Sequence, residues 1–128
     1  NRLDLNIFTE MNFEEIREYC MAKKGVTESF PFDETTLVFK VMGKMYALAS
    51  LENNPPSINL KCNPEKAIEL REDYSGVAPG FHMNKQHWNT VVFDGSFDDY
   101  QAKEWIDHSY ELTVSGLTKK LKAELAIL

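Results

Sequence analysis

The chain has 128 residues, and its 14 Lys and Arg against 20 Asp and Glu give a formal net charge of −6. This length suits one domain, and 43% hydrophobic residues exclude a disordered chain and make a stabilising disulfide or metal unnecessary. The acidic balance excludes a strongly basic protein that coats nucleic acid.

The first half of the chain predicts one helix followed by three strands. Asn12 and Glu15 have the spacing of a capping box, so a helix is expected to begin at Phe13. β-branched and aromatic residues in short runs then predict a hairpin and a third antiparallel strand. The predicted elements are a helix over 13–23, a loop over 26–35, and strands over 36–42, 45–51 and 57–62.

The second half predicts three more helices and one strand. Asn63 before Pro64 is a typical helix start, Ser96 and Asp99 form a second capping box, and Thr118 caps a last short helix. The elements expected here are a helix to about 73, a loop over 74–80, a strand over 86–93 and a long helix to about 114. The whole order is α-β-β-β-α-β-α-α, a single α+β domain with an antiparallel sheet of about four strands and helices packed on it.

Cysteine usage and hydropathy indicate a cytoplasmic protein. Cys20 and Cys62 both lie in apolar surroundings, which favours two buried, reduced thiols over a metal or redox pair, since no CxxC spacing is present. No run reaches the roughly 18 apolar residues of a membrane span, and no segment is typical of a signal peptide, so we expect no membrane partner.

The stretch at 80–90, GFHMNKQHWNT, is the richest in chemically useful side chains and admits three interpretations. A metal site would use His82 and His87, but no carboxylate lies near them in sequence. Acid–base catalysis would need one of these histidines to be oriented by Asp33 or Asp107. A recognition loop would use Lys and His for phosphates and Asn for base edges. In such a recognition loop Trp88 would stack on a base, although an indole more often lies in the core.

His108 lies on the long helix, beside the predicted buried positions Trp105, Ile106 and Ser109. A helix-surface histidine is the simpler interpretation of this position. A contact that responds to pH is the alternative.

Charge is distributed unevenly along the chain. Residues 1–60 carry 6 basic and 9 acidic side chains, residues 61–93 carry 4 of each, and residues 94–128 carry 4 and 7. The middle third is therefore neutral and holds His82 and His87 in addition. A polyanion is repelled least by this third of the chain.

Several segments resemble one family of small bacterial proteins, the MmcQ/YjbR family. They are MNFEEIREYCMAKKGVTESFPFD, TLVFKVMGKMYAL, INLKC, PGFHMNKQHWNTV and IDHSYEL, in collinear order from Met11 to about Leu125. The resemblance implies a fold similar to frataxin-like (CyaY-like) and secretion-chaperone-like domains. Residues 1–10, in which Leu3, Leu5 and Ile7 alternate like a short strand, are expected to be an N-terminal extension of a domain over 11–128.

The resemblance also implies a function, which is binding of double-stranded DNA through a double-wing arrangement without a catalysed reaction. The matching residues are Lys61, His82, Asn84, Lys85 and His87. Lys44 in the hairpin is expected to belong to a wing, and Trp88 to stack. We expect no catalytic residue, metal or cofactor. Binding several phosphates at a net charge of −6 requires the acidic helices to face away from the duplex.

Two other functions stay open at this point. One is a chaperone-like adaptor that binds a protein or peptide with the face or the edge of its sheet, which predicts an exposed apolar patch. The other is a small-molecule or enzyme site around His82, His87 and Trp88, which predicts a pocket where a histidine meets a carboxylate.

Overall fold

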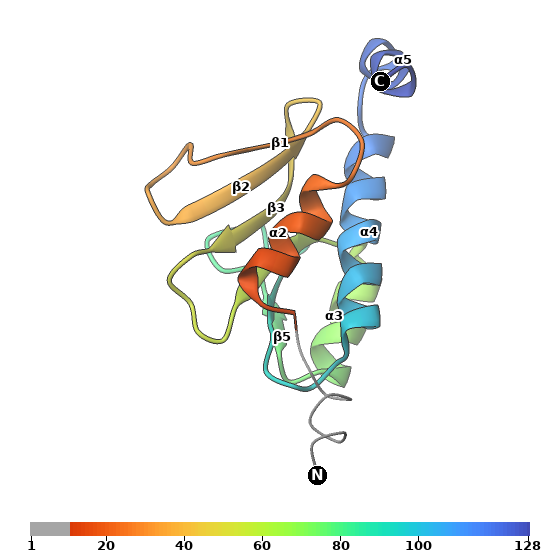
Figure 1. Cartoon of the computed structure of the whole chain (residues 1–128). Coiled ribbons are helices and arrows are strands. Elements are labelled where there is room, and N and C mark those ends of the chain that lie inside the picture. Colours follow the sequence, from red (N-terminus) through yellow and green to blue (C-terminus); the bar gives the residue numbers. More distant parts are fainter. Residues whose placement is uncertain (1–10) are drawn as a thin grey trace.

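A six-stranded antiparallel sheet with helices packed on one face forms the fold (Figure 1). The structure is a computed structural model and describes residues 11–128, so the strand and the extension expected within residues 1–10 lie outside the described residues. In chain order the elements are α2 (Phe13–Met21), β1 (Val26–Ser29), β2 (Thr36–Val41), β3 (Lys44–Ser50), β4 (Ser57–Lys61), α3 (Pro64–Asp73), β5 (Val77–Pro79), β6 (Trp88–Val92), α4 (Asp99–Ser115) and α5 (Lys119–Ala126).

The α+β class is confirmed, but the prediction of about four strands in the order α-β-β-β-α-β-α-α is wrong. Two short strands from the expected loops complete the sheet, whose order is β1-β2-β3-β4-β6-β5. β1 has four residues and β5 has three, too few for an alternating pattern to be recognised. Pro79 is tolerated in β5 because this strand lies at the edge of the sheet.

Most helix starts follow the predicted caps. Asn12 and Glu15 form the expected capping box, and Asn63 and Thr118 cap α3 and α5. The box expected at Ser96 and Asp99 is wrong, since Asp98 and Gln101 form it instead. The Ser96 hydroxyl accepts the N–H of Gly76, and the Asp99 carboxylate accepts the N–H of Met11. Both side chains are thus used by contacts that are distant in sequence.

The strands present two different faces. Side chains such as Leu37, Phe39 and Val41 enter the main core with the buried sides of α2 and α4. Side chains such as Val38 and Leu48 form a smaller cluster with Trp88 on the opposite face. We call this second face the open face, because the helices pack on the other one (Figure 1).

A β-bulge at Tyr46 shapes the hairpin of β2 and β3. Phe39 pairs with Ala47 while Lys40 pairs with Met45, so Tyr46 has no opposite residue. Ser109 of α4 is fully buried beneath the bulge, where its hydroxyl donates to the Tyr46 carbonyl at 2.5 Å and accepts the Lys61 N–H at 2.8 Å. The bulge leaves both Met45 and Leu48 on the open face.

Both cysteines are free and buried, as predicted. Burial raises the pKa of the Cys20 thiol to about 12 and also raises the pKa of Cys62. A buried neutral thiol behaves as a small hydrophobic group. Within residues 11–128 the chain has no helix of the length and hydropathy needed to cross a bilayer.

Candidate functional site

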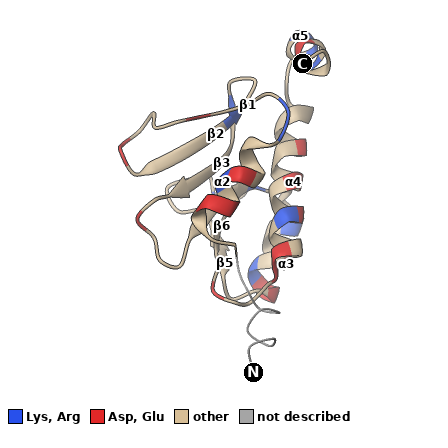
Figure 2. Cartoon of the chain, viewed as in Figure 1, with Lys and Arg blue, Asp and Glu red and all other residues tan. Residues whose placement is uncertain are grey.

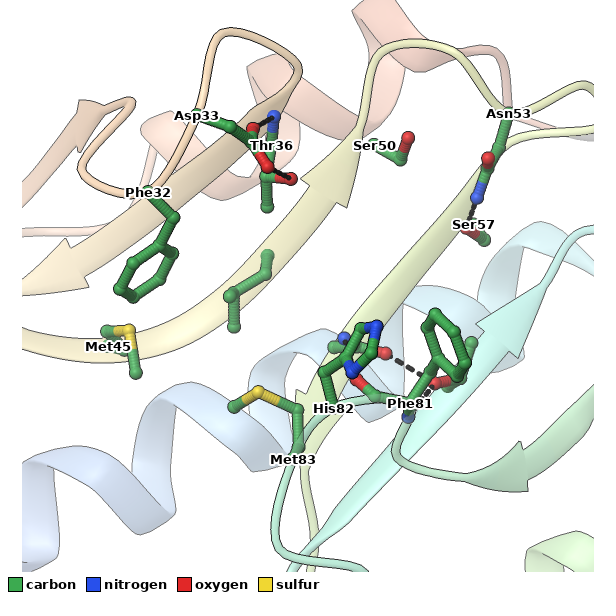
Figure 3. A pocket seen from close by; sticks show the side chains of 13 residues that line it. Phe32, Asp33, Thr36, Met45, Ser50, Asn53, Ser57, Phe81, His82 and Met83 are labelled. Carbon is green, nitrogen blue, oxygen red and sulfur yellow. Dashed lines mark hydrogen bonds between the residues drawn. The ribbon is translucent and has the colours of Figure 1, made fainter.

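A groove of about 460 Å³ lies on the open face, between the 30–35 loop and the 80–87 loop (Figure 3). Its base is formed by open-face residues of β2, β3, β4 and β6, and its rims by the two loops. The lining residues are Phe32, Asp33, Thr36, Met45, Leu48, Ser50, Asn53, Ser57, Asn59, Phe81, His82, Met83 and Thr90. Sites for small molecules have volumes of this order, and this one combines five apolar with eight polar lining residues.

The 80–87 loop is held close to β6 by its backbone. The Gly80 N–H donates to the Trp88 carbonyl at 2.8 Å, and the Phe81 N–H donates to the Thr90 hydroxyl at the same distance. A Cβ on Gly80 would lie 2.8 Å from the Trp88 Cβ and 2.9 Å from its carbonyl oxygen. Only glycine therefore fits at this close approach.

Two aromatic rings project from this loop over the groove. The Phe81 and His82 rings have centroids 4.0 Å apart, and Phe32 stands on the other side of the groove (Figure 3). Phe81 is 66% exposed and Phe32 is 63% exposed. His82 has a φ of +61°, a conformation that is uncommon for a residue other than glycine. Such backbone strain persists where surrounding contacts impose it.

The opposite rim is built around Asp33. Its carboxylate accepts the N–H groups of Thr35 and Thr36 at 2.9 and 2.7 Å, and both threonine hydroxyls as well. These hydrogen bonds lower the pKa of Asp33. The carboxylate is therefore used in holding its own loop, and it does not orient His82 as the acid–base hypothesis required.

Arg71 of α3 fastens the 80–87 loop from the helix side. Its Nε donates to Asn89 Oδ1 at 2.7 Å, and its Nη2 donates to the carbonyls of Lys85 and Trp88. Asn89 is buried on the face that packs against the helices, and its amide donates to the Ala67 carbonyl. The base of the loop is thus fixed to both α3 and β6.

The residues predicted within HMNKQHW have different positions. Asn84 accepts the N–H groups of Gln86 and His87 and so closes the turn, and the Lys85 ammonium donates to the Gly80 carbonyl at 2.7 Å. His82 lines the groove, whereas His87 is exposed and lies outside its lining. Trp88 is buried in the open-face cluster. Their part in binding nucleic acid stays a prediction.

The two predicted lysines of the sheet lie on different faces. Lys61 pairs with Trp88, and paired residues share a face, so Lys61 belongs to the open face. Lys44 pairs with Val41, whose side chain is in the main core, so its register assigns Lys44 to the helix-packed face at the exposed end of the hairpin.

The geometry gives little support to the acid–base and metal-site hypotheses. Asp107, the second expected partner for a histidine, accepts from the Tyr19 hydroxyl at 2.7 Å and pairs with Lys23 beneath α2. Among residues 11–128, no three His, Cys, Asp or Glu side chains are placed to hold a metal ion. Neither Asp33 nor Asp107 therefore orients His82 or His87.

His108 has a structural contact. Its Nε2 accepts the N–H of Asn63, the residue that caps α3, at 3.3 Å. Burial, with a smaller contribution from the Lys66 charge, lowers the pKa of His108. The neutral ring is the form that can accept this hydrogen bond.

The sequence analysis missed Phe32, Phe81, Asn59 and Lys40. The Thr90 hydroxyl donates to Asn59 Oδ1 at 2.5 Å, and Lys40 pairs with the groove-lining Met45. The alternation of side chains in β2 does indicate the position of Lys40. Residues two apart in a strand lie on the same face, so Lys40 shares the open face with Val38. No local pattern identifies the two phenylalanines, which lie in loops.

This fold and its groove define a class of small α+β domains whose antiparallel sheet has one face packed with helices and one face open. The family model YjbR matches residues 21–112, so the chain belongs to the YjbR family, which confirms the resemblance.

Relatives of known sequence and structure agree with this assignment. YjbR of Escherichia coli K12 is 38% identical over 110 residues, which cover 86% of this chain and 93% of that protein. The crystal structure of Deinococcus radiodurans DR2400 has a TM-score of 0.83 and 39% identity, over 90% of this chain and 88% of that one. A Pseudomonas syringae protein has a TM-score of 0.70 and 30% identity, over 80% and 99%. The name of the E. coli relative states no reaction.

Proposed function

We propose that this protein is a non-catalytic domain that binds nucleic acid through the open face of its sheet. The observation that carries the proposal is the separation of charge between the two faces. Helices α2, α3 and α4 contain eleven acidic and four basic residues, a net of −7. Strands β2, β3, β4 and β6 contain no acidic residue and three lysines, of which Lys40 and Lys61 lie on the open face and Lys44 on the helix-packed face. In Figure 2 the ribbon is coloured red for Asp and Glu at several positions of α2, α3 and α4.

The open face also has cations beside the groove. Lys40 and Lys61 lie on it by register, and the 80–87 loop adds Lys85 and no carboxylate. With the helices turned away from a bound strand, most of the acidic side chains face away from it, and Asp33 and Glu34 of the 30–35 rim are the acidic groups beside the groove.

Fluorescence anisotropy with labelled oligonucleotides at about 50 and 200 mM salt tests the proposal. Wild-type protein should bind, and raising the salt should weaken binding. Changing Lys40 and Lys61 together to Ala should weaken binding at low salt by about ten-fold or more and reduce the slope of log K against log salt by about two.

A charge-matched control is available on α5. Changing Lys119 and Lys120 to Ala removes the same net charge from exposed positions far from the groove lining. An equal effect of the two double variants, or absence of binding by wild-type protein at about 50 mM salt, would refute the proposal.

A second candidate is a protein- or peptide-binding adaptor, favoured by the exposed Phe32 and Phe81 on the same face. Binding of an uncharged peptide would change little between the two salt concentrations. It would also depend on Phe32 and Phe81 without depending on Lys40 and Lys61.

A further inference from the structure

We propose that the groove accepts one unpaired base, so that the nucleic acid bound by this protein is single-stranded. This inference rests on the proposed function, because it assigns the groove to the same ligand that the lysines contact. It differs from the duplex partner that the family resemblance implies.

The groove lining suits a flat, uncharged group. Within the described chain no Lys or Arg lines it, and its one carboxylate, Asp33, is occupied by Thr35 and Thr36. A phosphate would therefore have no cation inside the groove. A nucleobase has apolar faces and polar edges, which matches apolar walls over a polar base.

Aromatic walls stand on both sides of this space. The adjacent Phe81 and His82 rings line the groove from one rim and Phe32 lines it from the other (Figure 3). Base–aromatic stacking is worth about 1–3 kcal/mol per base and is tolerant of sequence. The hydrogen bonds of Gly80 and Phe81 to β6 fix the loop, so the Phe81 ring is ordered before a ligand arrives.

Polar groups of the groove lining can pair with the edges of a nucleobase. The Asn53 amide donates to the Ser57 hydroxyl at 2.6 Å, which leaves the Asn53 carbonyl oxygen directed to no partner within residues 11–128. The Asn59 amide donates to the Phe81 carbonyl at a long 3.4 Å, and a ligand can replace so weak a bond. Amide groups of this kind recognise bases by paired donors and acceptors.

The register places both lysines at the Met45 end of the groove, where they can meet phosphates next to such a base. Lys40 pairs with Met45, which lines the groove, and Lys61 lies two residues beyond Asn59 on the same face of β4. Two residues along a strand span roughly 7 Å. A duplex keeps its bases stacked and paired inside, and extruding one costs a few kcal/mol. A single strand offers its bases without that cost.

The experiment measures binding of four labelled probes of about 15 nucleotides: single-stranded DNA, the RNA of the same sequence, the DNA duplex, and an abasic strand that keeps the phosphates. We expect at least one of the base-carrying single strands to bind at least ten-fold more tightly than the duplex and the abasic strand. The DNA and RNA probes distinguish the two sources of a base.

Phe81→Ala should lower affinity for the preferred single strand by roughly 5- to 150-fold, the value of one base–aromatic stack. Its effect on the abasic strand should be small, and the slope against salt should not change. Phe81 is exposed, so this variant should fold. Phe30→Ala is the matched control, since Phe30 is 46% exposed and lies outside the groove lining.

Three results would overturn the inference. One is a duplex that binds as tightly as the single strands, with Phe81→Ala no weaker than Phe30→Ala. If the lysine variants still weaken binding in that case, the proposed function stands and the base site alone fails. The second is equal binding of the abasic strand. The third is displacement of every probe by an uncharged Phe- and Ser-containing peptide, which would assign the groove to a peptide.

Discussion

Replacing Arg71 with Met tests how the 80–87 loop is held in place. The guanidinium joins α3 to three acceptors, which are Asn89 Oδ1 and the carbonyls of Lys85 and Trp88. Methionine keeps the length of the aliphatic stem and removes every donor. The three acceptor oxygens differ in whether another hydrogen-bond donor can replace the guanidinium.

Only one acceptor becomes unsatisfied in the Met variant. The Trp88 carbonyl keeps the Gly80 N–H at 2.8 Å, and the Lys85 carbonyl is exposed and can bind water. Asn89 is 2% exposed, and its oxygen loses its donor inside the protein. An unsatisfied buried acceptor costs about 1–3 kcal/mol, so we expect a loss of about 2 kcal/mol and a fall in Tm of about 8 °C.

Urea unfolding followed by tryptophan fluorescence measures this loss, since Trp88 adjoins the loop and Trp105 lies in the main core. Arg17→Met is the matched control, because Arg17 forms an ion pair with Glu28 whose side chains are 40% and 25% exposed. An ion pair exposed to solvent in this way contributes little to stability. A free energy of unfolding for the Arg71 variant within about 0.5 kcal/mol of wild type would refute the reasoning.

The remaining predictions concern stability and access. Ser109→Ala should cost about 2–4 kcal/mol in urea unfolding, because one buried hydroxyl satisfies a carbonyl at the bulge and an N–H of β4. Gly80→Ala should shift the Trp88 fluorescence spectrum and lower Tm, since its Cβ meets the Trp88 backbone. The pKa of His108 in the folded protein is lowered below its ordinary 6.5, so the unfolded chain binds more protons as the pH falls. The contribution of His108 to stability should therefore be complete above about pH 6.5 and decline below it. Urea midpoints at about pH 7.5 and 5.5 measure this decline, which His108→Gln should reduce. Iodoacetamide should add no group to Cys20 or Cys62 in the native protein and two groups after unfolding, by mass spectrometry.

Local patterns were sufficient for the helices and the central strands. The Asn12 box and the Asn63–Pro64 start depend on residues within one turn, so the sequence alone locates them. The box at Ser96 was mistaken because both of its side chains bond to segments distant in sequence. The two edge strands were missed because pairing with β2 and β6, more than their own composition, makes them strands.

The site was harder to predict than the fold. The HMNKQHW segment stands out in the sequence, but in the structure its polar residues are largely used to build the loop. Asn84 closes the turn and Lys85 bonds to Gly80, while the neighbouring Phe81 projects over the groove. The other rim comes from Phe32, about fifty residues earlier, and only tertiary structure brings the two together. A pattern of adjacent residues carries no information about such a juxtaposition.

The charge and the groove together lead to a quantitative expectation for the salt dependence of binding. Few cations stand on the open face, with Lys40 and Lys61 the best placed, so only two or three phosphates can be neutralised. For a single strand the slope of log K against log salt should then be about −1.4 to −2.1, far from the value near −10 of a strongly electrostatic DNA-binding protein. Affinity must therefore come mainly from contacts that salt does not weaken, and stacking on Phe81 and Phe32 is of that kind. A net charge of −6 is compatible with nucleic-acid binding for this reason, because the ligand would be held chiefly by its bases.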